Sequence, residues 1–290
     1  MNRRRFLSLS AAFACAPHLA VADVWSGRAL GAECRVTLTG PRQETAAALA
    51  RIPGILAGIE GHFSLFAPGS DLARLNATGN LDRPAAAVRA LFDEADRAHA
   101  LTGGLFDPTV QPLWQALATG RAPGPARALI GWHRVRRDAA RITLAPGQQL
   151  TFNGIAQGFA SDAVRADLAS QGFTGALIDM GEIAALGGPF RIALEDPAAG
   201  PLGQLSVTGT ALATSSPGAL RLGNEAHILA PDGRRPLWSA VTIEADSAAR
   251  ADALSTAAVF MEAGALSRLK QAAGLHRITV VDRAGNLRSL

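Results

Sequence analysis

Apolar and polar positions alternate along residues 28–38, RALGAECRVTL, as they do in a strand with one buried face. From Pro41 the period lengthens, and apolar residues recur on one side of a helix that we expect to reach about Glu60. Residues 63–79 follow as a loop-rich segment with several turn residues. The first third of the chain therefore predicts a strand, a long amphipathic helix and a loop.

A second helix is predicted from Pro84 in its first turn to Gly103 just beyond its end, and a short apolar helix around Leu113. Short strands dominate later, with helices at 248–262 and 264–273 among them. The predicted strands are 141–144, 149–152, 190–194, 204–208, 210–214, 227–229, 238–244 and 276–281. Strands and helices in blocks, with hairpin spacings, predict an α+β fold with antiparallel sheets and packed helices.

The stretch 151–188 joins a polar turn, a helix and a buried strand. Asn153 is expected to cap the helix, which ends before Gly172, and the strand 176–178 follows. Gly154 and Gly158 lie one turn apart and leave one helix face without side chains. Such a face with free N–H groups is a seat for a phosphate, but the same glycines also serve close packing. Taken alone, the stretch favours packing.

The N-terminus predicts export. Arg3-Arg4-Arg5-Phe6-Leu7 fits the twin-arginine pattern, and Ala20-Val21-Ala22 offers a cleavage site before Asp23. We therefore interpret residues 1–22 as a twin-arginine signal peptide to the bacterial periplasm and 23–290 as the mature domain. A flexible basic tail, or lipoprotein cleavage at Cys15, is the weaker interpretation.

Removing that segment changes the charge and cysteine count. The whole chain has 28 Lys+Arg and 24 Asp+Glu, and residues 1–22 contain three Arg and no acid, so 25 basic residues face 24 acidic ones. Without a basic stripe or interleaved aromatics, nucleic-acid binding is not expected. Cys34 is then the only cysteine, which excludes an internal disulfide and a cysteine metal cluster. No apolar run reaches the roughly 18 residues of a membrane span.

Asp252 and Thr256 are the strongest candidates for metal chemistry. They stand at i and i+4 of a predicted helix, so their oxygens share one face. A carboxylate and a hydroxyl form an incomplete oxygen set of the kind that suits Mg²⁺, which retains waters and takes substrate phosphates as ligands. The alternative is structural: Asp252 complements the helix dipole and Thr256 bonds back to the helix.

Among the histidines, His227 stands out because it lies beside the turn Pro231-Asp232-Gly233. A histidine there can act as a base or contact a ligand, although a structural role is the simpler interpretation. The other histidines have no metal-ligand spacing. The dinucleotide motif G-x-G-x-x-G is absent, as are the phosphate-binding loop, the nucleophile elbow and H-E-x-x-H.

Seven segments in fixed order carry a resemblance that covers most of residues 23–290. They are FSLFAPGSDLARLN, TGGLFDPTVQPLW, FNGIAQGFASD, ALIDMGEIAALG, ATSSP, HILAPDGRRP and ADALSTA. Together they resemble the FAD:protein FMN transferases, the ApbE-type flavin transferases. The resemblance implies a single two-lobed catalytic unit with a flavin cleft between its lobes.

The resemblance also implies a reaction and a site. FMN would pass from FAD to a Thr or Ser hydroxyl of an acceptor flavoprotein, AMP would leave, and Mg²⁺ would sit at the pyrophosphate. By motif position the metal ligands are Gly154, Asp252 and Thr256, and the catalytic residues are His227 and Asp252. The implied FAD-binding residues are Leu30, Phe66, Leu105, Phe106, Asp107, Thr151, Gln157 and His227.

The sequence departs from the common family pattern at several positions. Thr151 stands where many members have Asp, Gln157 where many have Lys or Glu, Glu182 where many have Gly, and Ala230 where Asp is usual. Losing the charge at Thr151 puts metal affinity and turnover in question. The combination of NGIAQG, GEI and a twin-arginine signal is similar to the subgroup associated with nitrous oxide reductase maturation, whose acceptor is a membrane flavoprotein.

Two other functions remain open from the sequence. One is a Mg²⁺-dependent FAD pyrophosphatase, in which water replaces the acceptor hydroxyl. The other is a non-catalytic periplasmic FAD-binding protein, which the departures at Thr151 and Gln157 favour and the intact pair Asp252 and Thr256 opposes.

Overall fold

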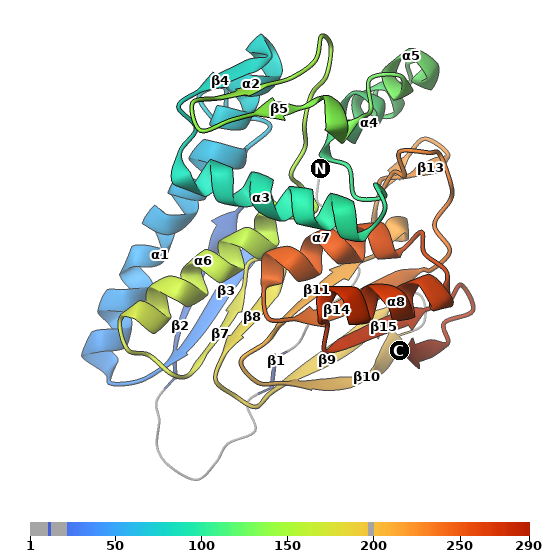
Figure 1. Cartoon of the computed structure of the whole chain (residues 1–290). Coiled ribbons are helices and arrows are strands. Elements are labelled where there is room, and N and C mark those ends of the chain that lie inside the picture. Colours follow the sequence, from blue (N-terminus) through green and yellow to red (C-terminus); the bar gives the residue numbers. More distant parts are fainter. Residues whose placement is uncertain (1–10, 13–21, 197–199) are drawn as a thin grey trace.

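An eight-stranded sheet organises the computed structural model, which describes residues 11–12, 22–196 and 200–290 (Figure 1). All its neighbouring strands are antiparallel, which agrees with the α+β prediction. Across the sheet the order is β16 (Leu287–Ser289), β15 (Arg277–Val281), β14 (Ala240–Ala245), β11 (Ala211–Ser215), β8 (Ile183–Leu186), β7 (Ala176–Asp179), β3 (Ala32–Thr39) and β2 (Ala22–Ala29). Of the predicted signal peptide only Ala11, Ala12 and Ala22 are described, so that prediction lies outside the described residues.

Helices cover one face of this sheet (Figure 1). They are α1 (Arg42–Phe63), α6 (Ala156–Ser170), α7 (Ala248–Ala258) and α8 (Ala263–Ala273), with α3 (Ala86–Leu101) lying over α7. The core between them is dry: Val36, Ile178 and Ile243 from the sheet and Leu254 from α7 are fully buried. Each such side chain contributes about 1.5–3 kcal/mol by leaving water.

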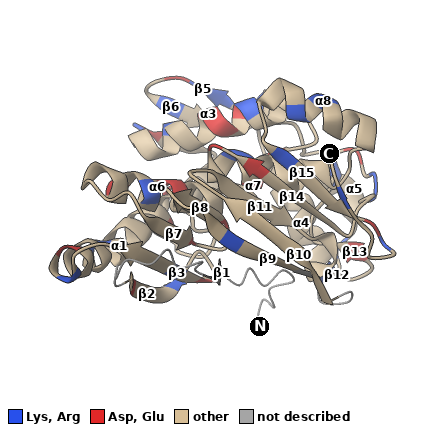
Figure 2. Ribbon diagram, turned by 90° about the horizontal axis from the view of Figure 1, so that it is seen from below, with Lys and Arg blue, Asp and Glu red and all other residues tan. Residues whose placement is uncertain are grey.

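The opposite face of the sheet carries a hairpin (Figure 2). Its strands, β9 (Phe190–Asp196) and β10 (Gly200–Val207), pair antiparallel, and β1 (Ala11–Ala12) pairs with β9. Phe190 and Val207 pack against Leu177 and Leu212 of the large sheet as a second, smaller core. The sheet therefore has apolar residues on both faces at its centre.

A smaller upper part is built mainly from residues 64–150 (Figure 1). Its helices are α2 (Asp71–Thr78), α4 (Gln111–Ala118) and α5 (Pro123–Arg127), with short 3₁₀ turns η1 (Pro108–Val110) and η2 (Trp132–Arg134). A three-stranded sheet joins β4 (Asn80–Asp82), β6 (Arg141–Thr143) and β5 (Arg136–Arg137). Beside α4 lies the hairpin β12 (Arg221–Leu222) and β13 (Glu225–Ala226), which follows η3 (Pro217–Ala219).

Several predicted boundaries are wrong for local reasons. The strand expected at 28–38 is two strands, because Leu30 and Gly31 adopt φ angles of 51° and 75° and turn the chain back. The segment 63–79 contains α2, whose first turn is capped by Ser70 accepting from the Ala73 amide. A side-chain oxygen at an N-cap stabilises even so short a helix.

Other corrections lie near the polar stretch and in the C-terminal half. Asn153 does not cap the following helix: the N-cap position is Ile155, without a side-chain cap. Residues 149–152 and 227–229 are not strands, and the helix expected at 248–262 ends at Ala258. Strands β8 and β16 had no separate prediction from periodicity.

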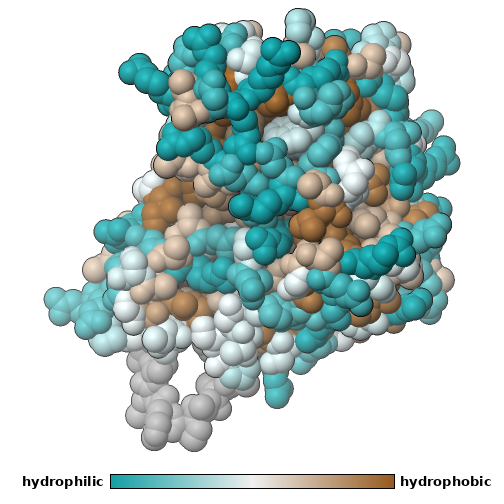
Figure 3. All heavy atoms as spheres, in the orientation of Figure 1, coloured by the Kyte–Doolittle hydropathy of each residue, from teal (hydrophilic) through white to brown (hydrophobic). Residues whose placement is uncertain are grey.

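The surface seen in Figure 3 is largely hydrophilic, with apolar side chains in separate patches. Within the described part of the chain, no helix is long and apolar enough to cross a membrane. Among the described residues, Phe66 is the most exposed large apolar residue, at 80%. It lies in the loop between α1 and α2.

Candidate active site

The start of α6 and the length of α7 pack so closely that only glycine fits between them. A Cβ on Gly158 would lie 2.2 Å from the Ala248 carbonyl oxygen, and one on Gly154 would lie 2.6 Å from the Thr256 hydroxyl. Gly154 lies directly before Ile155, the N-cap residue of α6. The helix face without side chains is therefore occupied by α7. At Gly158 the structure supports close helix packing and not a seat for a phosphate.

Asp252 points into this contact. Its side chain is buried, and its Oδ2 accepts a hydrogen bond of 3.2 Å from the Gly158 amide. Among the described residues this is the only hydrogen bond to the carboxylate. Burial raises the pKa of Asp252 to about 7, and the bond from Gly158 opposes that rise only in part. Such a carboxylate lacks the compensation that a buried charge needs, and a cation would supply it.

Thr256 is oriented by a chain of hydroxyl groups. Ser255 Oγ donates to the Asp252 carbonyl at 3.0 Å, so in the 2.8 Å contact between Ser215 and Ser255 the proton comes from Ser215. Ser215 Oγ then accepts from Thr256 Oγ1, which lies 3.5 Å away. The Thr256 proton is therefore directed toward Ser215, and the lone pairs of its oxygen face elsewhere.

The resulting set consists of one carboxylate, one hydroxyl and the backbone of Gly154. No group of three His, Cys, Asp or Glu that could hold a metal occurs in the ranges that the structure describes. A site with a single carboxylate does not suit a cation that needs a complete protein shell. It fits Mg²⁺, which retains waters and shares substrate phosphates, so the residues present are compatible with that ion.

The turn between β7 and β8 lies beside Gln157. A Cβ on Gly181, whose φ is 105°, would lie 2.7 Å from the Gln157 amide nitrogen, so this side chain packs directly on the turn. Asp179 Oδ1 accepts from the Gly181 amide at 3.0 Å, and the Ser161 hydroxyl donates to the Glu182 carbonyl at 2.6 Å. Both ends of the turn are thereby fixed, and α6 presents two polar side chains to it, Gln157 and Ser161.

Glu182, one of the departures from the family pattern, has a structural partner. Its side chain is buried, and Oε2 accepts from the Thr214 amide of β11 at 3.1 Å. The carboxylate thus joins the β7–β8 turn to the neighbouring strand. A glycine here could not make that connection.

His227 follows β13 and is held by backbone carbonyl groups. Its Nδ1 lies 3.3 Å from the Pro217 oxygen and 3.2 Å from the Leu220 oxygen. Carbonyl oxygens only accept, so Nδ1 carries the proton and donates it. In the neutral ring Nε2 is then the basic atom.

The predicted FAD-binding residues stand on several elements. Leu30 occupies the β2–β3 turn and donates its amide to Glu60 Oε1, Phe66 is exposed, Leu105 is half-buried and Phe106 is buried. Asp107 has a structural role, because Oδ1 accepts from the Thr109 amide at 2.8 Å and Oδ2 accepts from the Trp132 amide at 3.1 Å. Thr151 Oγ1 accepts from the Asn153 amide at 3.2 Å.

Comparison with known proteins gives the family. The sequence profile of the ApbE family matches residues 30–279, which is most of the chain. The chain belongs to the ApbE family. Among curated proteins none matches it in sequence.

Solved structures agree with this membership. The apo flavinyl transferase ApbE of Pseudomonas stutzeri is 27% identical, with 95% of this chain and 96% of that chain covered and a TM-score of 0.81. The flavin transferase ApbE of Vibrio cholerae is 22% identical, with coverages of 93% and 97% and a TM-score of 0.80. The ApbE protein of Thermotoga maritima is also 22% identical, with coverages of 92% and 96% and a TM-score of 0.78. The fold is thus shared over nearly the whole length.

Within this ApbE fold, three predicted metal ligands come together: Gly154 and Thr256 touch, and Asp252 lies one turn away against Gly158. Gln157 lies on the adjoining turn. Leu30, Phe66 and His227 lie on separate elements. Sequence reasoning assigned no role to Ser215, although the segment ATSSP contained it. The role of Ser215 depends on Ser255 and Thr256, which are distant in sequence.

Proposed function

We propose that this ApbE-family chain transfers the FMN part of FAD to a Thr or Ser hydroxyl of an acceptor flavoprotein and releases AMP in a Mg²⁺-dependent reaction. Family membership and the likeness to the Pseudomonas stutzeri enzyme support the coarse part, flavin transfer to a protein. The finer part rests on the oxygen groups that α7 brings to the start of α6.

One observation carries the metal requirement. The Asp252 carboxylate is buried with one 3.2 Å hydrogen bond from the residues that the structure describes, and its pKa is raised by that burial to about 7. Thr256 adds a hydroxyl one turn along the same helix, beside Gly154. We assign the metal to the Gly154 carbonyl, Asp252 and Thr256, because hard oxygen ligands are what Mg²⁺ prefers.

When bound, Mg²⁺ would offset pyrophosphate charge as the bond to the leaving group breaks. The acceptor oxygen forms a bond to the FMN-side phosphorus, and the bond from that phosphorus to the bridging oxygen breaks, so that AMP keeps the bridging oxygen. The acceptor proton goes to a base. His227 is our candidate, because donation from Nδ1 to backbone carbonyls leaves Nε2 as the basic atom.

The remaining residues would bind FAD. Phe66, which is 80% exposed, would face the flavin. The other proposed contacts to the pocket and phosphates are Leu30, Leu105, Phe106, Asp107, Thr151 and Gln157. Since the Asp107 carboxylate already accepts two backbone N–H groups, we expect it to shape the pocket through the 131–132 loop.

The place of action belongs to the same proposal. A twin-arginine signal at residues 1–22 would export the folded mature domain, residues 23–290, to the periplasm. The acceptor would be a membrane-bound flavoprotein with a Thr or Ser target, as in the subgroup associated with nitrous oxide reductase maturation. The support for this step is the sequence alone.

The test combines the mature chain, FAD, Mg²⁺ and a Thr-containing acceptor domain, with acceptor mass and AMP followed together. FMN addition with matching AMP is expected, with loss of both products in EDTA. In Asp252→Ala we expect FAD to bind and AMP release to stop, while Asp167→Ala, on the outer side of α6 against Arg51, retains activity. His227→Gln should slow transfer by about 10²–10⁴-fold without releasing FAD.

Other results would redirect the assignment. Free FMN and AMP formed without acceptor identify a pyrophosphatase. FAD binding without either product, for several acceptors, identifies a binding protein, in line with the uncharged Thr151 and Gln157. Undiminished AMP release by Asp252→Ala contradicts the metal assignment.

A further inference from the structure

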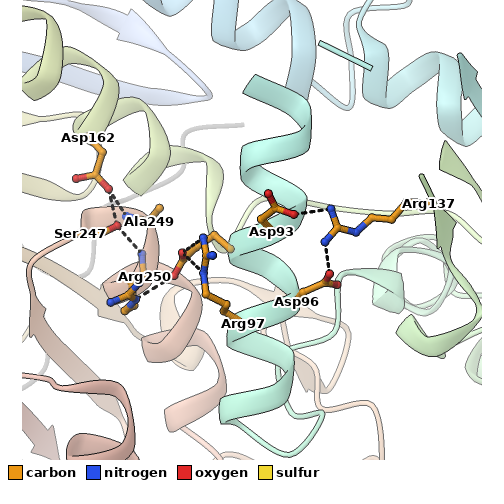
Figure 4. A network of polar contacts seen from close by, with 9 residues as sticks. Asp93, Asp96, Arg97, Arg137, Asp162, Ser247, Ala249 and Arg250 are labelled. Atoms are coloured by element: carbon orange, nitrogen blue, oxygen red, sulfur yellow. Dashed lines mark hydrogen bonds and ion pairs between the residues drawn. The ribbon is translucent and has the colours of Figure 1, made fainter. Parts of the chain in front are cut away.

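Asp162 on α6 holds the N-terminus of α7 (Figure 4). Its Oδ1 accepts from the Ala248 amide at 3.0 Å, and its Oδ2 accepts from the Ala249 amide at 3.0 Å and the Ser247 hydroxyl at 2.7 Å. The first N–H groups of a helix have no partner within the helix. Here a carboxylate from another helix supplies those partners, and its charge complements the positive end of the α7 dipole.

This bond set is one of three contacts at intervals of one helical turn. Asp162 meets residues 247–249, Gly158 meets Ala248 and Asp252, and Gly154 meets Thr256. The two segments therefore run antiparallel in a fixed register. Asp162 supplies the only charged contact of the three on the α6 side.

Register matters because the proposed ligands come from both segments. A slip of one residue along a helix moves a side chain by about 1.5 Å. Metal–ligand distances tolerate only about 0.2 Å. Gly154 and Gly158 have no side chains with which to resist such a slip, so at these two positions steric contact limits approach but not sliding.

Two further contacts keep α7 attached at the same end without fixing this register. Arg250 Nε donates to Glu94 Oε1 of α3 at 3.1 Å (Figure 4). Arg165, which also pairs with Asp162 Oδ1 at 2.7 Å, donates to the Asp246 carbonyl at 2.6 Å. Both use long, flexible side chains. A variant at Asp162 is therefore expected to fold.

We propose that Asp162 is a positioning residue for the metal site, which it serves by locking the register of α7 against the segment 154–162. It touches neither the metal ligands nor FAD and acts through the backbone of residues 248 and 249. The inference rests on the proposed function, because it concerns the affinity of the metal set Gly154, Asp252 and Thr256.

The decisive measurement is Mn²⁺ binding by electron paramagnetic resonance in the absence of FAD, for the mature chain and for Asp162→Asn. We expect the dissociation constant to rise about ten-fold, as for other residues that support metal ligands indirectly. With Mg²⁺ as the varied component, the half-saturating Mg²⁺ concentration should rise and kcat at saturating Mg²⁺ should recover. If Asp162 served only as a structural cap, the substitution would lower Tm but would not raise the half-saturating Mg²⁺ concentration.

The matched control is Asp167→Asn, which alters a carboxylate on the same helix that pairs with Arg51 away from α7. It should leave the Mn²⁺ constant unchanged. Ser247→Ala removes one of the three bonds from the start of α7 to Asp162, together with the N-cap bond from the Arg250 amide, and should raise the Mn²⁺ dissociation constant by a smaller factor.

The outcomes are separable. An unchanged Mn²⁺ constant in Asp162→Asn overturns the positioning role while leaving the metal site intact. If Asp162→Asn does not fold, Ser247→Ala decides in the same way, and loss of folding in both also overturns the proposal, since Asp162 would then serve the fold itself. Absence of Mn²⁺ binding to the unaltered chain refutes the proposed metal site instead.

Discussion

The Glu60 carboxylate accepts a 2.8 Å hydrogen bond from the Leu30 amide, so the last turn of α1 supports the β2–β3 turn. Leu30 needs that support because its φ of 51° lies in the left-handed region, at a cost of about 1–2 kcal/mol for a residue with a Cβ. Backbone strain that neighbouring groups maintain is often found at ligand sites. Leu30 is one of the residues that we propose to contact FAD.

Replacing Glu60 should therefore affect FAD binding as well as stability. Glu60→Ala leaves the Leu30 amide without its partner and should lower the free energy of unfolding by about 1–3 kcal/mol. FAD affinity, measured by flavin fluorescence, should fall several-fold as the turn relaxes. Glu44→Ala in the first turn of the same helix is the control. Equal FAD affinity in both variants would remove Leu30 from the site.

The glycine contact predicts opposite effects for two Gly→Ala changes. At Gly158 the new Cβ would stand 2.2 Å from a backbone oxygen of α7, so the helices must separate, and we expect a loss of about 3 kcal/mol or more. At Gly54, inside α1, nothing lies within 4 Å of the new Cβ, and the change should stabilise by about 0.5–1 kcal/mol. Urea unfolding measures both, and a mild Gly158→Ala would contradict the packing described above.

The raised pKa of Asp252 predicts a pH-dependent stability in EDTA. Folding raises this pKa from 3.8 to about 7, so the folded state binds the proton more tightly than the unfolded state. The stability from this group is complete below pH 3.8 and is lost as the pH rises to about 7, by on the order of 4 kcal/mol.

Asp252→Asn isolates this contribution. As the pH rises from 4 to 7, the free energy of unfolding should fall less in the variant than in the unaltered chain, because Asn does not titrate. At pH 8 and without metal, the variant should be more stable than the unaltered chain. Added Mg²⁺ should raise Tm of the unaltered chain more at pH 8 than at pH 6, because protons compete for the carboxylate, and should not raise that of Asp252→Asn. Identical pH profiles would show that Asp252 is not the titrating group.

The hydroxyl chain predicts a role for Ser215. Ser215→Ala removes the group that accepts the Thr256 proton, so the lone pairs of Thr256 are no longer directed. We expect Mn²⁺ affinity to fall by several-fold, with Tm lowered by only a few degrees, as for loss of one neutral hydrogen bond of about 1 kcal/mol. Ser170→Ala, at an exposed hydroxyl bonded to Asp167, should change neither quantity. An Mn²⁺ constant that matches the control would show that Thr256 does not need this orientation.

Much of the fold could be predicted because periodicity and breakers are local. The helices near α3, α6 and α8 and the antiparallel blocks follow from apolar spacing with Pro and Gly at the ends. The turn at Leu30 could not be read from alternation, because a two-residue hairpin turn preserves the alternating pattern on both sides. The Ser70–Asp71 cap of α2 was a readable signal in a segment predicted to be a loop.

For the candidate site, too, only the local geometry could be predicted from the sequence. The i, i+4 spacing correctly predicted that Asp252 and Thr256 share a helix face, because that depends on one helix alone. What that face meets could not be derived, since Gly158 and Asp252 are brought together by the intervening strands. Contacts between residues distant in sequence also explain why the roles of Ser215 and Glu182 became visible only in the structure.

The contact between α6 and α7 also sets when the site can exist during synthesis. The strands β7, β8, β11 and β14 lie between the two helices in sequence and pair with one another at the centre of the large sheet. Contacts of such high sequence separation form late in folding. A nascent chain therefore cannot form the proposed metal site until α7 has left the ribosome, and metal occupancy would report that the strands between α6 and α7 have folded.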